Sequence, residues 1–201
     1  MLCRRRESLL KQSDKETIRL AVEISTQRSY ADIITSCRQE LCKYFGFEGL
    51  GLLFRDTATN DLFSVERDFS QDEEAEAARL REKKRQGKTL SDEERLRDLE
   101  FQLRPGTKNN FPNSLGITGE VYHSREIYYE SEIKKAKSYV AGLDNQSKYV
   151  KEVSSILVTP IYGHKNDDGS DNLVGIAQFV NKINGRITEK DKVSLLLFNF
   201  Q

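Results

Sequence analysis

The sequence predicts an α+β fold in which an antiparallel sheet is covered by helices. Apolar residues recur with helical spacing near the N-terminus, whereas later segments are short apolar-rich runs separated by turn signals. The chain has 201 residues, which is enough for one domain with a full core. Hydrophobic residues make up only 37% of it and charged residues 32%, so we expect the domain to carry a solvated appendage.

Two helices are predicted first. Ser13 and Glu16 form a capping box for one, and the other is predicted to begin near Ser29 and to end at Gly46. The second helix has one apolar stripe, made of Tyr30, Ile33, Ile34, Cys37, Leu41 and Phe45. Residues 49–67 then contain two apolar runs around a polar turn, which predicts a β-hairpin.

Residues 70–105 have a different character, because acids come first and bases follow, as the dipole of a helix favours. Gly87 ends this run, and Ser91 with Glu94 forms a capping box for a second charged helix. We therefore expect an inserted helical hairpin whose apolar stripe is too thin to build a core of its own. Two interpretations remain open, a solvated insertion and a docking arm for another protein. The candidate contacts of such an arm are Arg79, Arg81, Leu96 and Leu99.

After the insertion the globular pattern resumes. Gly116 and Gly119 bracket the start of a short helix, and a strand is predicted at residues 127–129. Residues 134–151 form a polar stretch that we expect to be mobile. A buried strand is predicted at residues 155–164, and a turn at residues 166–169 leads into a last strand.

Charge and cysteine content limit the functional classes. The formal net charge is zero, so the chain as a whole has no field that attracts nucleic acid or an anionic membrane. We interpret residues 1–12, with Arg4, Arg5 and Arg6, as a basic N-terminal tail. Three cysteines without a CxxC pair indicate a reduced, intracellular protein. We expect a cytoplasmic location, with association with the cytoskeleton left open.

A family resemblance rests on four ordered segments, LGITGEVYHSREIYY, SILVTPIYG, DNLVGIAQFVNKING and ITEKD. In this order they resemble the GAF domains, and most closely those of the cyclic-nucleotide phosphodiesterases. VNKING is the most specific part. The resemblance implies one GAF-like domain over residues 13–201, interrupted by the insertion.

The resemblance implies a structural role for Asn181, Lys182 and Asp191, in which the lysine and the aspartate form an ion pair. Ile187 stands here in place of the phenylalanine of the pattern. A lysine at a strand end with an acid across a glycine turn is placed to stabilise that turn, whereas catalysis needs a perturbed group that faces a substrate. His123 and His164 are the only histidines. Neither stands in a metal-ligand pattern, and no nucleophile motif is present, so we expect a non-enzyme without a metal or a cofactor.

A ligand pocket is the alternative that the family suggests. The helix start at Gly116, Ile117 and Thr118 offers free backbone N–H groups that suit a cyclic phosphate. The resemblance places pocket threonines of binding-competent members on Tyr149 and Val153, which are bulkier or lack a hydroxyl here.

Two acidic positions of that pocket also depart from the family pattern. Gln178 replaces a glutamate, and a pocket aspartate falls near Gln146, with Asp144 or Asn145 as neighbours that could serve. Each polar ligand group left unpaired costs about 1–3 kcal/mol, so these departures weigh against cyclic-nucleotide binding.

The predicted last helix carries an apolar stripe that includes Leu196 and Phe200, and such a stripe favours a partner. We therefore expect a non-catalytic GAF-like regulatory or assembly module within a larger intracellular complex. Its partners would be other protein subunits or a second copy of the chain, bound through the insertion and the terminal helices. The alternative is a domain that senses cGMP, cAMP or another small molecule.

Overall fold

The computed structural model describes residues 30–66, 70–103, 106–147, 150–183, 185–188 and 191. The first predicted helix, with Ser13 and Glu16, lies outside these residues. The described chain divides into two compact units, one made of residues up to 64 and from 110 onward, and one made of residues 65–109.

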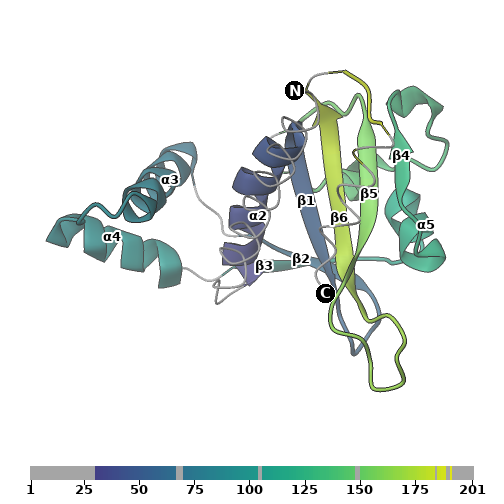
Figure 1. Cartoon of the computed structure of the whole chain (residues 1–201), viewed down its shortest axis with the longest axis horizontal. Coiled ribbons are helices and arrows are strands. Elements are labelled where there is room, and N and C mark those ends of the chain that lie inside the picture. Colours follow the sequence, from purple (N-terminus) through teal and green to yellow (C-terminus); the bar gives the residue numbers. More distant parts are fainter. Residues whose placement is uncertain are drawn as a thin grey trace, which may run out of the picture. The chain divides into compact units, whose positions relative to one another are not determined.

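Six strands form one sheet, and helices lie on both of its faces (Figure 1). The strand order is β3-β2-β1-β6-β5-β4. The strands are β1 Phe47–Arg55, β2 Leu62–Glu66, β3 Thr107–Phe111, β4 Tyr128–Glu130, β5 Ile156–Tyr162 and β6 Leu173–Lys182. β6 lies between β1 and β5 and pairs antiparallel with both. The predicted α+β class is therefore confirmed.

One strand was not predicted. Four of the five residues of β3 are exposed, so its sequence TKNNF has no buried alternation that would identify a strand. β3 forms because the chain returns from the insertion beside β2, where an edge of the sheet is open.

Helix α2, Tyr30–Phe45, covers one face of the sheet and runs alongside β1 (Figure 1). Its predicted stripe packs inward, with Ile34, Cys37, Leu41 and Phe45 all buried. The ring of Phe45 meets that of Phe179 on β6 at 5.7 Å, edge to face. Gly46 follows the helix with a φ of 67°, the left-handed conformation in which glycine ends helices.

The opposite face carries α5, Gly116–Ser124. Ile117 and Val121 of α5 belong to a buried cluster with Leu53 of β1 and Ile176 of β6. Residues 49, 51 and 53 of β1 and residues 176, 178 and 180 of β6 share this face, because side chains alternate along a strand and these residues are paired in register. Gln178 is therefore a polar residue in the middle of an apolar layer.

Part of the stretch that we expected to be mobile, residues 134–151, packs against the rest of the fold. It contains a short 3-10 turn, Ile133–Lys135, and one helical turn, α6, Ala141–Asp144. Leu143 and Asp144 are buried, with exposed fractions of 5% and 0%. Mobility of the stretch stays a prediction, but its polar composition does not mean full solvent exposure, because Asp144 bonds to α5 and Asn145 bonds to the carbonyl of Val150.

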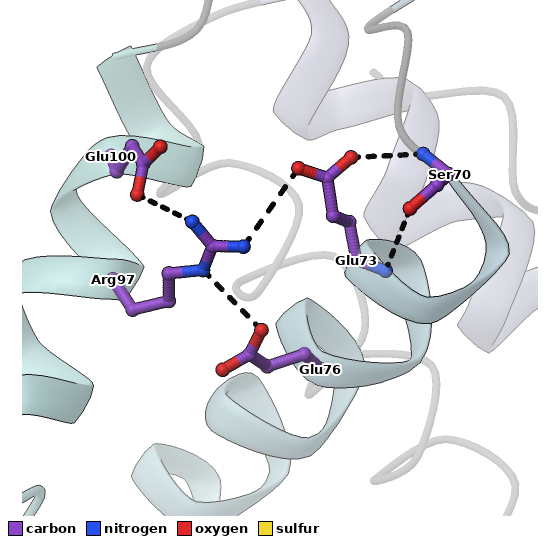
Figure 2. A network of polar contacts seen from close by, with 5 residues as sticks. All are labelled: Ser70, Glu73, Glu76, Arg97 and Glu100. Carbon is purple, nitrogen blue, oxygen red and sulfur yellow. Dashed lines mark hydrogen bonds and ion pairs between the residues drawn. The ribbon is translucent and has the colours of Figure 1, made fainter.

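The second unit is the predicted helical hairpin. Its helices are α3, Gln71–Arg85, and α4, Asp92–Leu103. Ser70 and Glu73 form a reciprocal capping box at the start of α3 (Figure 2). The predicted capping box of α4 is present as well, with distances of 3.2 Å from Ser91 N to Glu94 Oε2 and from Glu94 N to Ser91 Oγ.

The hairpin has a small core of its own, which corrects our expectation that it would have none. The core consists of Ala77, Leu80, Leu90 and Phe101. The candidate partner contacts Leu96 and Leu99 lie outside this core, since Leu96 is 70% exposed and Leu99 is 50% exposed. Among the described helices, none is both long enough and apolar enough to cross a membrane.

Candidate functional site

The start of α5 holds a buried carboxylate that belongs to the chain itself. Gly116 has a φ of 70°, and the backbone N–H groups after it point out of the helix end. Asp144, the last residue of α6, accepts hydrogen bonds from Ile117 N at 3.0 Å and from Thr118 N at 2.8 Å. Thr118 Oγ1 donates to the same carboxylate at 2.6 Å, and Val140 N donates at 2.8 Å. A helix N-terminus favours an anion, and here Asp144 supplies it.

Gln178 extends this network into the sheet. Its Nε2 donates to Thr118 Oγ1 at 2.6 Å and to the carbonyl of Leu143 at 2.8 Å. Its Oε1 accepts from Gln146 N at 3.1 Å. An amide both donates and accepts, so glutamine satisfies all three contacts, whereas a glutamate at neutral pH accepts only. Thr118 in turn accepts from Gln178 and donates to Asp144, and all three side chains are fully buried.

Glycines let the segment of residues 144–147 lie directly on the sheet. A Cβ on Gly49 would stand 2.7 Å from Ser147 Cβ, and one on Gly51 would stand 2.8 Å from Gln146 Cβ. A Cβ on Gly116 would stand 2.6 Å from the Asp144 carboxylate. These separations are shorter than packed carbon and oxygen atoms tolerate. The chain itself therefore fills the space between β1 and the start of α5.

Arg38 of α2 links the same segment to β1. Its Nε donates to the carbonyl of Leu50 at 3.0 Å, and its guanidinium NH2 donates to the carbonyl of Gln146 at 2.8 Å. The segment is thus bonded to α5, β6 and α2 at once.

Lys182 and Asp191 form an ion pair at the end of β6. The Lys182 Nζ lies 2.6 Å from Asp191 Oδ1, and the two side chains are 13% and 17% exposed. The ammonium also donates to the carbonyl of Phe45 at 2.7 Å and lies 4.8 Å from the centre of the Phe47 ring. Burial raises the pKa of Asp191, but hydrogen bonds from Lys182 and Thr188 outweigh it, so the pKa lies below its ordinary value.

Asn181 forms a second structural contact beside this ion pair. It has a φ of 56°, a conformation that asparagine tolerates better than most residues. Its Nδ2 donates to the Glu152 carbonyl at 2.8 Å and its Oδ1 accepts from Ser154 N at 2.7 Å. Asn181 therefore joins the end of β6 to the segment that leads into β5.

No protein-family model matches the sequence, and no curated protein matches it either. Solved structures do match. The chain superposes on the GAF domain of an Acinetobacter phosphoenolpyruvate-protein phosphotransferase with a TM-score of 0.54 and 14% identity, covering 92% of this chain and 87% of that one. The GAF domain of the corresponding protein from Coxiella burnetii gives 0.53 and 12%, covering 92% and 88%. The chain has a GAF fold.

The same fold occurs in a structure of the free methionine-R-sulfoxide reductase from Neisseria meningitidis in complex with its substrate. That chain matches with a TM-score of 0.54 and 13% identity, covering 93% of this chain and 83% of that one. At such identities the likeness concerns the fold alone. The GAF fold by itself therefore decides neither for nor against catalysis.

Four of the predicted pocket residues come together within the GAF fold: Gly116, Ile117 and Thr118 at the helix start, and Gln178 on β6. Val153 packs against the core cluster instead. Tyr149 lies outside the described residues, as do Leu196 and Phe200. Asp144, which we considered only as a substitute for an aspartate near Gln146, is the centre of the network. Its sequence signal, an acid among polar residues before a strand, is too common to identify it.

The described thiols and imidazoles lie away from this network. Cys37 and Cys42 are on α2, on the other face of the sheet. Burial raises the pKa of Cys37 to about 12 and that of Cys42 to about 11. His123 is an exposed residue in the last turn of α5, and His164 is exposed after β5. In the described residues, no three His, Cys, Asp or Glu side chains gather as metal ligands would.

Proposed function

We propose that this GAF-fold chain is a non-catalytic regulatory or assembly module that acts through protein interaction within a larger intracellular complex. Asp144 is the observation that carries the proposal. Its carboxylate already bonds the N–H groups of Ile117 and Thr118, which are the donors that a cyclic phosphate would need. The GAF fold then serves as a scaffold rather than as a receptor.

Displacement of Asp144 by a ligand would be costly. Each hydrogen bond to a charged group contributes about 1.5–3 kcal/mol, and Asp144 accepts four of them. A ligand would have to replace these bonds and find a new environment for the expelled carboxylate. It would also have to move Gln146 and Ser147 away from Gly51 and Gly49. This cost supports a pocket closed by the chain itself.

The proposal that the chain is not an enzyme is supported by the state of Cys37, Cys42 and Asp191. A thiol reacts as the thiolate, and the raised pKa values of Cys37 and Cys42 keep both thiols protonated at neutral pH. Asp191 is held by Lys182 and Thr188 and is therefore engaged in structure.

Exposed leucines of the insertion support the interaction role. Leu96 and Leu99 are three positions apart on α4, so they form one apolar patch on the hairpin surface. Of the other candidates, Arg79 pairs with Glu94 within the hairpin at 2.9 Å. We propose that Leu96 and Leu99 provide the contact, that Arg79 and Arg81 on α3 are further candidate contacts of the hairpin, and that Leu196 and Phe200 supply a second one.

Calorimetric titration tests the closed pocket. We expect no measurable heat of binding when cGMP or cAMP is added to the unaltered chain at up to millimolar concentration. The matched variant is Asp144→Ala, which frees the donors at the start of α5. Micromolar binding to the unaltered chain would contradict the proposal and establish a sensor instead.

Affinity capture tests the interaction role. The full chain, the double variant Leu96→Asp/Leu99→Asp and a chain lacking residues 70–104 would be used as bait, after each is shown to be folded. We expect partner proteins to be retained by the full chain and lost with both altered baits. Equal recovery of partners with all three would remove the insertion from the proposal.

A cyclic-nucleotide sensor is the second candidate. Asp144 itself favours it in one respect, because it demonstrates that the α5 start accepts a carboxylate at 2.8–3.0 Å from two backbone nitrogens. The likeness of VNKING to phosphodiesterase GAF domains adds to it. In this alternative, the phosphate would take the place of Asp144, and residues 140–147 would leave the sheet on binding.

A further inference from the structure

Helix α4 has two faces of opposite character. The residues that contact α3 or the hairpin core lie on one side of the helix: Glu94, Arg97, Asp98 and Phe101. Arg97 reaches across to Glu76 at 3.3 Å and to Glu73 at 3.9 Å (Figure 2). Glu94 accepts from Lys83 at 2.5 Å, which lowers the pKa of Glu94 to about 2. This face is thus satisfied within the hairpin.

The other face carries the exposed leucines. At 100° per residue, the directions of Leu96 and Leu99 average about 180° from the mean direction of the four inward residues. Their exposed fractions of 70% and 50% agree with that placement. The side of α4 opposite α3 is therefore apolar at its centre, and the other large hydrophobic residues whose burial is described in the hairpin, Leu80, Leu90 and Phe101, are buried.

Heptad positions describe this outer face. With Leu96 at position a and Leu99 at position d, Arg95 takes position g and Glu100 takes position e. The four inward residues take positions f, b, c and f, which a coiled-coil partner does not touch. In sequence, Leu103 stands seven residues after Leu96, at the next a position. Helix α4 therefore has the residue pattern of one short coiled-coil helix, and its contacts with α3 already hold it in place.

Charge selects the partner and its direction. In a parallel pair of identical helices, a residue at g faces the residue five positions later at e of the other helix, so Arg95 would face Glu100. Both side chains are accessible, at 62% and 55% exposed. In an antiparallel pair, e faces e, which would bring Glu100 of one copy near Glu93 of the other. Like charges there oppose that arrangement.

The geometry points to a self-association surface on α4. Two copies of the chain pair through α4, parallel and in register, with Leu96 and Leu99 in the seam and Arg95 bonded to Glu100 of the other copy on each side. This inference rests on the proposed interaction role and names a second copy as the partner. Asp92, the d position in the first turn, is 97% exposed and remains in water where the helices diverge. The seam is short, so association is weak and depends on concentration.

Sedimentation velocity of the full chain over a range of protein concentrations measures the pairing. We expect a reversible monomer–dimer equilibrium that Leu96→Asp/Leu99→Asp abolishes. The matched control is Ile183→Asp, which changes a 55% exposed apolar residue of the other unit and should leave the equilibrium unchanged. A chain that stays monomeric at all concentrations would overturn the inference, and so would a dimer that the double variant leaves intact.

Exchange of the charges at Arg95 and Glu100 tests whether the two α4 helices pair in parallel. Arg95→Glu and Glu100→Arg should each weaken self-association about tenfold, because two ion pairs become two repulsions. A mixture of the two variants should dimerise as well as the unaltered chain, and so should the double variant with both changes. Thermal melting of each variant checks the hairpin, since Glu100 also bonds Arg97 at 2.7 Å.

Tighter self-association of Glu100→Arg alone would identify an antiparallel pair and contradict the proposed direction, because the introduced guanidinium would then face Glu93 of the other copy. If the chain does not pair with itself but the affinity capture recovers a different protein through the insertion, this inference fails while the proposed function stands.

Discussion

Asp144 Oδ1 lies 2.6 Å from Thr118 Oγ1, and both side chains are completely buried. The contact joins the single turn α6 to the start of α5 and places a negative charge where the positive end of the helix dipole favours it. Gln178 donates to the other side of the same hydroxyl at 2.6 Å. The donors at the head of α5 are thus satisfied by the chain itself.

Removal of the carboxylate should destabilise the domain. Asp144→Ala leaves the N–H groups of Ile117 and Thr118 buried without an acceptor, at a cost of about 3–5 kcal/mol, as for other broken buried charge networks. The free energy of unfolding, calculated from the midpoint and the slope of a chemical denaturation curve, measures this loss of stability. Asp167→Ala, in an exposed loop, is the control and should change stability by less than about 0.5 kcal/mol. Equal stability of the two variants would contradict the network.

The variant Gln178→Glu should be destabilised in a pH-dependent manner. A glutamate there replaces two donated hydrogen bonds with a second negative charge beside Asp144, which disfavours the folded state by about 2–4 kcal/mol at neutral pH. The introduced carboxyl would have a raised pKa in the folded state, so the loss should shrink as the pH falls and the group is protonated. Unfolding curves of both chains at pH 7 and pH 5 would detect the change. An equal loss of stability at both pH values would contradict the two hydrogen bonds that Gln178 Nε2 donates.

Glycines under the segment of residues 144–147 should resist substitution. Gly51→Ala places a methyl group 2.8 Å from Gln146 Cβ and Gln178 Oε1, so a loss of about 1–3 kcal/mol is expected from overpacking. Gly142→Ala is the matched control, since a Cβ there has no atom within 4 Å and alanine favours the helical turn. The free energies of unfolding of the two variants are compared, and a Gly51 variant as stable as the Gly142 variant would show that the segment lies elsewhere.

The ion pair of Lys182 and Asp191 should contribute about 1 kcal/mol, because both side chains are largely but not completely buried. The pKa of Asp191 is lowered in the folded state, so the carboxylate contributes its stability above the ordinary pKa and loses it as the pH falls through the lower, folded value. Asp191→Asn should therefore cost most near neutral pH, and little at pH values below the folded pKa of Asp191. A pH series of melting temperatures for both chains tests this, and a cost that does not change with pH would exclude an electrostatic contribution.

Much of the sheet could be predicted from the sequence because strong patterns define it. The apolar runs of β5 and β6 and the stripe of α2 are long enough to decide their own structure. β3 and α6 could not be predicted, since β3 is exposed and α6 is a single turn. Both depend on neighbours that only the fold supplies.

The candidate site shows the same division. The helix start with Gly116 and Thr118 was predicted from glycine spacing, whereas Asp144 was not, because its role depends on a contact across 26 residues of sequence with Thr118. Leu96 and Leu99, named from the sequence as candidate partner contacts, are exposed, but the residues of the hairpin core were not predicted. Leu90 and Phe101 occupy the hairpin core instead, and this follows from how α3 and α4 pack together.

Nuclear magnetic resonance of the backbone amides of Ile117 and Thr118 tests the central claim most directly, because these N–H groups bond Asp144. We predict that both resonances stay unchanged when cGMP, cAMP or inorganic phosphate is added to millimolar concentration, and that both shift in Asp144→Ala without any ligand. Saturable shifts of the two resonances in the unaltered chain would mean that a ligand takes the place of Asp144, which contradicts a pocket closed by the chain itself.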